Sequence, residues 1–411
     1  MNINKKAIEA HKKLKGKIGI LAKVKIKHFI DLSLYYTPGV GAVSSYLAKN
    51  KSETRNFTIK NNTVAVVSDG SAVLGLGNIG PEGALPVMEG KAMIFKEFAG
   101  IDAFPIVLAT QNIDEIVETV KNIAPVFGGI NLEDIAAPKC FEVEKRLKEI
   151  LDIPVMHDDQ HGTAIVVLAG IISAFKAVGK NIFNSKIVVV GAGAAGNAIT
   201  KLLYEYGIRN IFVLDSKGII NRKRKDLNPI RSYERGSRFV SNGVNFANGA
   251  SGVNKYKREL AEITNKENIS GNIVDALIGA DAVIGVSAAG AIKPEYILKM
   301  NKNPIVFAMA NPIPEIMPKE ARKAGAFIMA TGRSDFPNQI NNALVFPGLF
   351  RGALDNGVKK ITNEMKLRAA LKLAGLIKKP NPEKIIPSIF DKRVVKAVAG
   401  VIHIFIFFNL L

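Results

Sequence analysis

The stretch that decides the fold runs from Lys186 to Gly196 and reads KIVVVGAGAAG. Residues 187–190 are all β-branched, which is typical of a parallel strand buried on both faces. The glycines that follow have GxGxxG spacing: Gly191 suits a tight turn, Gly193 a close backbone approach to a ligand, and Gly196 the packing of helix on strand. A strand, a glycine turn and a helix in this order predict a dinucleotide-binding unit.

The helix that opens after this turn offers unpaired N–H groups to a pyrophosphate. The expected cofactor-binding residues of the loop are Gly191, Ala192, Gly193, Ala194, Ala195 and Gly196. Asp215 ends the next expected strand, where an acid bonds the ribose hydroxyl. Because a carboxylate repels a 2′-phosphate, the sequence favours NAD over NADP. Lys217 and Arg222 lie nearby in the chain and would weaken that preference.

Strands and helices alternate along the rest of the chain, which predicts the α/β class. The expected strands are 62–68, 104–109, 128–132, 211–214, 282–286 and 305–308, and the expected helices are 86–98, 113–123 and 163–178. We predict an N-terminal α/β domain over 1–160 and a doubly wound, Rossmann-like domain over 161–380, followed by a C-terminal tail or helix over 381–411. Residues 221–257 are polar and rich in Gly and Asn, which indicates an insertion or a mobile loop.

The charge balance and the cysteine count limit the binding partners and the cellular compartment that we expect for this protein. Lys and Arg exceed Asp and Glu by 56 to 36, a net charge of +20, but the basic residues are spread along the chain. The densest cluster, 222–238, has too few aromatic residues for a stacking platform, so we expect no nucleic-acid partner. The single cysteine, Cys140, excludes an intrachain disulfide. The N-terminus lacks the apolar core of a signal peptide, so we predict a cytoplasmic protein.

Two pairs of adjacent acids suggest a metal site. Glu133-Asp134 follows an expected strand, and Asp158-Asp159 lies between an apolar segment and an expected buried helix. Such pairs often lie on a solvated face, but unpaired carboxylates next to a core are costly. A hard cation such as Mg²⁺ or Mn²⁺ would offset their repulsion. Zinc is a weaker alternative, since we expect His157 and His161 to pack or form hydrogen bonds.

Amide side chains add a further candidate group. Asn311 follows the expected strand 305–308, at the end of the strand where ligands bind in such sheets. Asn341 and Asn342 precede the apolar segment 343–348. Turn chemistry is the alternative interpretation for all three, because Asn and Pro both mark turns.

Taken together, these segments resemble the malic enzyme family in its shorter prokaryotic form. The resemblance covers residues 31–374 and rests on motifs in family order: YYTPGVG, LGLGNIGPEGALPVMEGK, NLEDI, HDDQHGTA, GAGAAG, DSKG, ANPIPE and GRSDFPNQINNALVFPG. It implies oxidative decarboxylation of malate to pyruvate and CO₂ by an oxaloacetate-decarboxylating malate dehydrogenase. The cofactors that it implies are NAD or NADP and Mg²⁺ or Mn²⁺, and we expect a homodimer or larger homo-oligomer.

The resemblance also implies roles for single residues. Tyr36 corresponds to the general acid, Lys91 to the general base and Asp158 to a member of their network. Asn311, Asn341 and Asn342 correspond to contacts with the substrate or with the nicotinamide end of the cofactor. The implied metal ligands are Glu133, Asp134 and Asp159.

Two departures from the family pattern stand out. Longer relatives carry an arginine before the LGLG segment to bind a substrate carboxylate, and Ser71-Ala72 stands here instead, which leaves Arg351 or an amide as candidates. The apolar run 401–408 departs from the expected polar terminal helix, but it is shorter than the ~18 residues of a spanning helix, so we expect no membrane partner. Two other functions remain open: a malolactic-like lyase without net redox, and an inactive NAD-binding relative with a basic surface.

Overall fold

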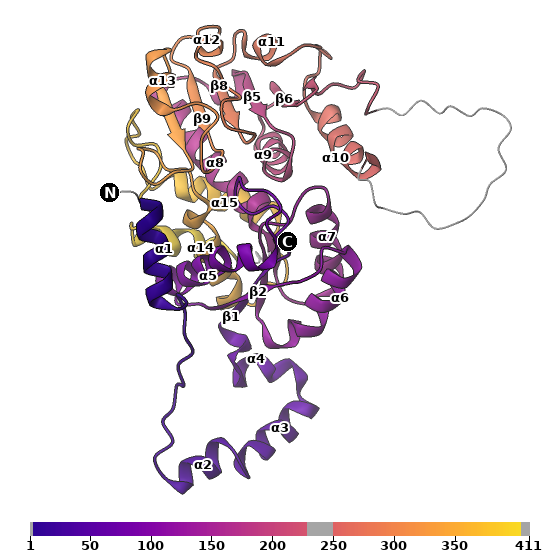
Figure 1. The fold of residues 1–411 in the computed structure, drawn as a ribbon, viewed down its shortest axis with the longest axis vertical. Helices are drawn as coiled ribbons and strands as arrows, with labels where there is room; N and C mark the ends of the chain where they lie inside the picture. The colour runs from indigo at the N-terminus through magenta and orange to yellow at the C-terminus, as the bar shows by residue number, and fades with distance from the viewer. Residues whose placement is uncertain (1–2, 228–249, 404–411) are drawn as a thin grey trace, which may run out of the picture.

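The computed structural model describes residues 3–227 and 250–403, which form two parallel sheets with helices around them (Figure 1). Residues 228–249, which make up most of the expected insertion, and 404–411, which make up most of the apolar C-terminal run, lie outside the described residues. The expected α/β class and the doubly wound second sheet are confirmed. The domain boundaries at 160 and 380 stay predictions.

The first sheet has four parallel strands in the order β2-β1-β3-β4. They are β1 (Thr63–Ser68), β2 (Asp102–Val107), β3 (Gly129–Leu132) and β4 (Val155–His157). The helices of this part are α5 (Gly80–Ala99), α6 (Ile113–Ile123) and α7 (Lys139–Ile150). All parallel strands point the same way, so the segments after β1, β3 and β4 meet at one edge of the sheet.

The second sheet has six strands in the order β10-β9-β8-β5-β6-β7, of which only β7 is antiparallel. They are β5 (Ile187–Val190), β6 (Ile211–Asp215), β7 (Gly218–Ile219), β8 (Ala282–Gly285), β9 (Ile305–Ala308) and β10 (Ile328–Thr331). Helix α9 (Ala194–Glu205) follows β5 directly after the glycine turn. This is the strand–turn–helix unit that the sequence predicts.

Helix α8 (Asp158–Val178) joins the two sheets. Its apolar residues share one core with Val64 and Val66 of β1 and with Val189 of β5. It is the one helix in the described ranges that is long and apolar enough to cross a membrane, but most of it is buried inside the protein. Its composition is therefore explained by its place in the core.

After the second sheet the chain returns to the first. Helix α14 (Phe346–Asp355) packs against Phe95 of α5. The ring centroid of Phe95 lies 4.7 Å from that of Phe346 and 5.5 Å from that of Phe350. Helices α15 (Asn363–Ala374) and α16 (Arg393–Ala399) complete this side. The remaining helices are α1 (Ile3–Leu14), α2 (Phe29–Tyr35), α3 (Gly39–Lys49), α4 (Thr54–Phe57), α10 (Ala250–Ile263), α11 (Ile273–Leu277), α12 (Pro294–Ile297) and α13 (Pro318–Lys323).

Several element bounds differ from those expected. Helix α5 begins at Gly80 rather than 86, because Pro81 sits in its first turn, where a missing N–H costs nothing, and Pro86 is accommodated inside the helix. Helix α8 begins at Asp158 rather than 163, so the second acid pair lies in its first turn. Strand β2 begins and ends two residues earlier than expected.

Candidate active site between the two sheets

A cavity of about 800 Å³ lies where the two sheets meet. The first sheet and its helices contribute Lys91, Glu133 and Asp134, and α8 contributes Asp159. The second sheet contributes Asn311, after β9, and the glycine turn contributes Gly193. The cavity therefore connects the predicted metal ligands and the predicted general base, Lys91, with the loop predicted to bind the cofactor.

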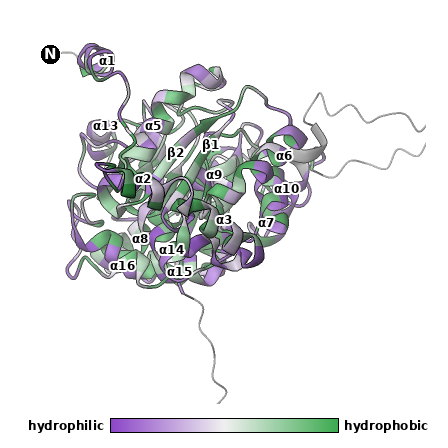
Figure 2. Cartoon of the chain, turned by 90° about the horizontal axis from the view of Figure 1, so that it is seen from below, coloured by the Kyte–Doolittle hydropathy of each residue, from purple (hydrophilic) through white to green (hydrophobic). Residues whose placement is uncertain are grey.

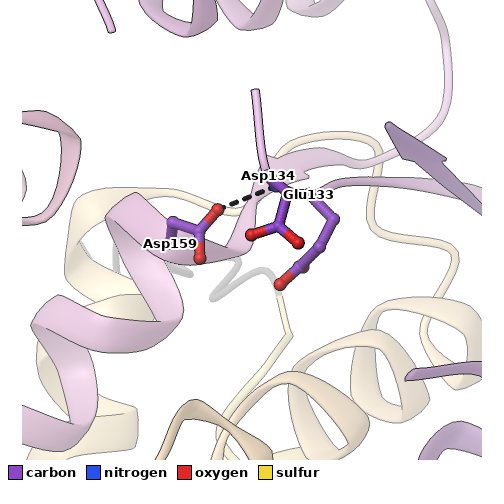
Figure 3. Close-up of side chains that lie close together, drawn as sticks. All are labelled: Glu133, Asp134 and Asp159. Atoms are coloured by element: carbon purple, nitrogen blue, oxygen red, sulfur yellow. Dashed lines mark hydrogen bonds between the residues drawn. The ribbon is translucent and has the colours of Figure 1, made fainter. Parts of the chain in front are cut away.

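Three carboxylates converge at one point of this cavity. Glu133, Asp134 and Asp159 each offer an oxygen, and these atoms all lie within 4.8 Å of one another (Figure 3). The backbone N–H of Asp134 donates to Asp159 at 2.9 Å, which fixes β3 to the start of α8. Oδ2 of Asp134 is buried without a hydrogen-bond partner among the described residues. Such a buried acceptor, among hard oxygen donors, fits a divalent cation such as Mg²⁺ or Mn²⁺.

Lys91 lies beside this trio and is itself buried. Its Nζ is 2.9 Å from Oε1 of Glu133 and donates a short hydrogen bond to Asp158. Asp158 is fully buried at the N-terminus of α8, where the helix dipole favours a negative charge. The ammonium also lies 4.2 Å from the ring centroid of Phe346. These contacts hold the amino group at the cavity wall.

The charges in this cluster shift one another's ionisation. Burial raises the pKa of Glu133 well above its usual range, and burial together with the Asp159 carboxylate raises the pKa of Asp134 to about 7. Burial lowers the pKa of Lys91, but the carboxylates of Asp158 and Glu133 raise it by more, so the net direction is upward. One ammonium faces an excess of buried carboxylates, which is the electrostatic condition that a cation relieves.

The loop after β1 fixes Asp134 from the other side. Asp69 accepts from the N–H of Ser71 at 3.0 Å and is paired with Lys139. The N–H of Ala72 then donates to the carbonyl of Asp134 at 2.9 Å. Asp134 itself has a positive φ of 53°, a costly conformation for a non-glycine residue that these contacts hold in place.

A second cavity, of about 680 Å³, lies along the glycine turn and the end of β6. A Cβ at Gly191 would lie 2.3 Å from the carbonyl oxygen of Val286, and one at Gly196 would lie 1.8 Å from the carbonyl oxygen of Gly191. Only glycine fits at either position. At Gly193, by contrast, a Cβ would meet nothing within 4 Å, so the open space there belongs to the cavity. This arrangement fits a pyrophosphate lying across the turn.

Asp215 lies at the end of β6, as predicted, but its carboxylate is held by two cations. Arg224 donates to both its oxygens, at 2.8 and 3.1 Å, and Lys257 donates at 2.5 Å. Burial raises the pKa of Asp215, but these hydrogen bonds lower it by more. The cations that contact this carboxylate are thus Arg224 and Lys257, while the ammonium of Lys217 pairs with Asp226 and Arg222 donates to Asn268; whether Lys217 and Arg222 weaken the preference for NAD stays a prediction.

The side-chain amides lie where the sequence predicts. Asn311, Asn341 and Asn342 all line the larger cavity. Sequence reasoning missed Glu315, which is buried and accepts from the N–H groups of Ser287 at 2.7 Å and Ala310 at 3.0 Å. It joins the ends of β8 and β9 beneath the cofactor loop. The sequence signal that could have identified Glu315 is its position at the end of the ANPIPE motif.

Two predicted candidates lie elsewhere. Tyr36 directly follows α2 as its C-cap, is 63% exposed and is not among the residues that line the cavity, so its acid role stays a prediction. Arg351 forms an ion pair with Asp355, donates to Asn62, and lines a different hollow, so it is not among the residues that line the larger cavity. His161 bonds Glu144 at 3.0 Å, as expected of a histidine that does not bind metal. His157 is fully buried.

The chain is similar to known proteins in both sequence and structure. The family described as malic enzyme, N-terminal domain, matches residues 15–148, and that described as malic enzyme, NAD binding domain, matches 160–403. The bifunctional malic/malolactic enzyme of Bacillus subtilis is 50% identical over 97% of this chain and 92% of its own length. The NAD-dependent malic enzyme of Geobacillus stearothermophilus is 53% identical over 93% of this chain and 75% of its own. A crystal structure of the Thermotoga maritima NAD-dependent malic enzyme has a TM-score of 0.87 at 49% identity, covering 96% of this chain and 98% of that one.

The carboxylate trio predicts a stability that depends on pH and on cations. The pKa of Asp134 is about 7 in the folded chain and 3.8 ordinarily, so the folded chain binds the extra proton and its stability falls as pH rises across that window. In EDTA, Asp134→Asn should melt at a higher temperature than wild type at pH 8 and at nearly the same temperature at pH 5. Added Mn²⁺ should raise the melting temperature of wild type much more than that of the variant.

The matched control is Asp152→Asn, because Asp152 is an exposed acid that pairs with Lys359 at the surface. It should follow wild type in both EDTA and Mn²⁺. An equal rise in melting temperature with Mn²⁺ for wild type and Asp134→Asn would contradict the assignment of the trio.

Proposed function

The chain belongs to the malic enzyme family and catalyses the oxidative decarboxylation of malate with NAD(P), and we propose that the reaction takes place in the cavity between its two sheets. The observation that carries this proposal is the meeting of Lys91, three convergent carboxylates and the glycine turn around one cavity. The predicted cytoplasmic location is kept as part of the proposal.

The reaction requires three events at one substrate. The C2 hydroxyl loses its proton as the C2 hydride leaves, the carboxylate β to the new ketone leaves as CO₂, and C3 then takes up a proton. Nicotinamide supplies the hydride acceptor. A divalent cation held by Glu133, Asp134 and Asp159 would supply a Lewis acid that stabilises the negative charge developing during loss of CO₂.

Lys91 is the proposed general base for the hydroxyl proton. A lysine accepts a proton only in its neutral form, and in the chain alone its carboxylate neighbours raise its pKa. Positive charge bound among those carboxylates would remove this effect and leave burial, which lowers the pKa, in control. Asp158 orients the amino group through its hydrogen bond and is therefore a positioning residue.

Tyr36 is the proposed acid that returns a proton to C3. A neutral phenol can donate to a carbanion-like centre, whereas the ionised carboxylates around the cation cannot. The proton taken at the hydroxyl and the proton given at C3 balance, so the organic steps consume none overall. Asn311 and the pair Asn341 and Asn342 have donors suited to the substrate carboxylates in place of the absent arginine.

NAD is the proposed preferred nucleotide, because Asp215 lines the second cavity at the end of β6, where an acid would accept from the ribose hydroxyls. Arg224 and Lys257 lower the cost of a 2′-phosphate there, so we expect measurable use of NADP as well. Relatives named NAD-dependent and NADP-dependent both match the chain at similar identity.

The direct test is an assay of malate with NAD or NADP, with and without EDTA, following the reduced nicotinamide and the organic product. The proposal predicts equal amounts of pyruvate and NADH, with activity lost in EDTA and restored by Mn²⁺. Lactate formed without NADH would instead favour the malolactic function that forms part of the name of the Bacillus subtilis relative. Full activity in EDTA would contradict a divalent cation held by the three carboxylates.

Replacement of the proposed base gives a second prediction. Lys91→Met keeps the length and apolar stem of the side chain and should lower kcat about 10²–10⁴-fold, the usual effect of losing a general base. Lys96→Met is the matched control, because Lys96 lies on the same helix but is 63% exposed and pairs with Asp102. It should keep nearly the wild-type rate. Calorimetry should show NAD bound equally by both variants, and a small effect of Lys91→Met on kcat would rule out the base.

Nucleotide choice gives a third prediction. Asp215→Ser removes the carboxylate but leaves Arg224 and Lys257, so the ratio of kcat/KM for NADP to that for NAD should rise at least tenfold. Asp226→Ser is the comparison, because Asp226 pairs with the same arginine at 2.7 Å but does not line the nucleotide cavity. It should change the ratio little. Equal responses of NAD and NADP to Asp215→Ser would show that the acid does not read the ribose.

A further inference from the structure

Residues 15–61 form an arm that stands away from the body of the protein (Figure 1). It is tied to the body at both ends: Lys17 donates to the carboxylate of Glu89 on α5, and the other end continues into β1. Between these points the arm carries α2, α3 and α4, none of which has a buried residue. The arm makes its own helices but shares no core with its own chain.

The arm exposes large apolar side chains along α2. Phe29 is 90% exposed, Ile30 71% and Leu34 60%, and Figure 2 shows hydrophobic residues, in green, along α2. Contiguous exposed apolar surface of this kind marks an interaction site on a soluble protein. The arm therefore requires a surface to cover it.

A matching apolar surface lies beside the mouth of the active-site cavity. Leu74 lines the cavity and is 57% exposed; Leu76 and Ile79 follow it, also exposed, on the loop before α5, and Leu85 is exposed in the second turn of that helix. The described part of their own chain leaves each of these residues 41–59% exposed. The same protein thus exposes an apolar arm and an apolar rim around its cavity.

The cavity also lacks the tyrosine that the proposed mechanism uses as its acid. Among residues 3–227 and 250–403 it is lined by Lys91, by His11 and Lys17 of the N-terminal segment, and by carboxylates and amides, but by no tyrosine. The tyrosine that the malic enzyme motif assigns as the acid, Tyr36, lies in the arm, at the end of α2 and 63% exposed. An arm that packs beside a cavity would therefore both bury its apolar side chains and supply the missing tyrosine.

We propose that two copies of the chain exchange their arms about a two-fold axis, so that each cavity receives Tyr36 of the partner subunit. In a two-fold pair the arm of each copy covers the rim of the other, so both exposed surfaces are buried without a third component. Each site then combines Lys91 from one chain with the tyrosine of the second chain. The need for an acid in the site rests on the proposed function, whereas the exchange of arms rests on the exposed apolar surfaces alone.

Subunit complementation tests the exchange. Tyr36→Phe and Lys91→Met chains carrying different affinity tags are co-expressed, and the mixed dimer is isolated by tandem purification. With exchanged arms, one site of the mixed dimer holds both lesions and the other holds none, so pyruvate production should return to about half the wild-type rate per dimer. If each arm served its own chain, both sites would carry one lesion, and the mixed dimer would stay as inactive as either parent. A monomer in sedimentation at assay concentration would also overturn the proposal.

The matched control is Tyr35→Phe, because Tyr35 is the neighbouring exposed tyrosine of α2. This variant should keep nearly the wild-type rate, alone or in a mixed dimer. If Tyr36→Phe homodimers were also fully active, the acid role would fail rather than the exchange.

Cross-linking then decides the exchange without reference to activity. Mixed dimers of ¹⁴N- and ¹⁵N-labelled chains are treated with a lysine-specific cross-linker. Mass spectrometry then identifies the cross-linked peptides that join Lys27 or Lys49 of the arm to lysines of the body. Links that join light and heavy peptides support the exchange. Links confined to peptides of one isotope overturn it.

Discussion

The active site depends on one ammonium set against an excess of buried carboxylates. Lys91 touches Glu133 and Asp158, while Asp134 and Asp159 complete the group at its side. Like charges gathered away from water raise the free energy of the folded state unless other charges compensate them. A single lysine compensates only part of this charge. The remainder destabilises the metal-free fold and, for the same reason, gives the site its proposed affinity for a divalent cation.

Helix α8 is what makes this concentration of charge possible. Its first turn carries Asp158 and Asp159, where the helix dipole favours anions, and its remaining turns form the core that unites the two sheets. Any movement of α8 relative to β3 would therefore change both the packing and the spacing between Asp159 and Asp134. The same helix fixes the sheet that carries the glycine turn relative to Lys91, which is why we place the proposed reaction at the junction of the two sheets.

Local patterns could be predicted from the sequence, and tertiary contacts could not. Gly191 and Gly196 were assignable because their roles are steric and depend on neighbours within one strand–turn–helix unit. The two acid pairs stood out because charge beside an apolar segment is unusual, and three of their four carboxylates do converge, while their metal role stays a prediction. The pairing of Asp215 with Lys257 joins residues that are distant in the chain, and no periodicity encodes it. Whether Tyr36 reaches a cavity depends on the path of a whole arm, which its motif does not specify.

The most direct test of the account is a crystal structure of the chain with Mn²⁺, NAD and tartronate, a malate analogue that keeps the hydroxyl and both carboxylates. The account predicts an anomalous manganese peak coordinated by Glu133, Asp134 and Asp159, with the hydroxyl of the analogue within hydrogen-bond distance of Nζ of Lys91. Manganese bound elsewhere, or a hydroxyl turned away from Lys91, would contradict it.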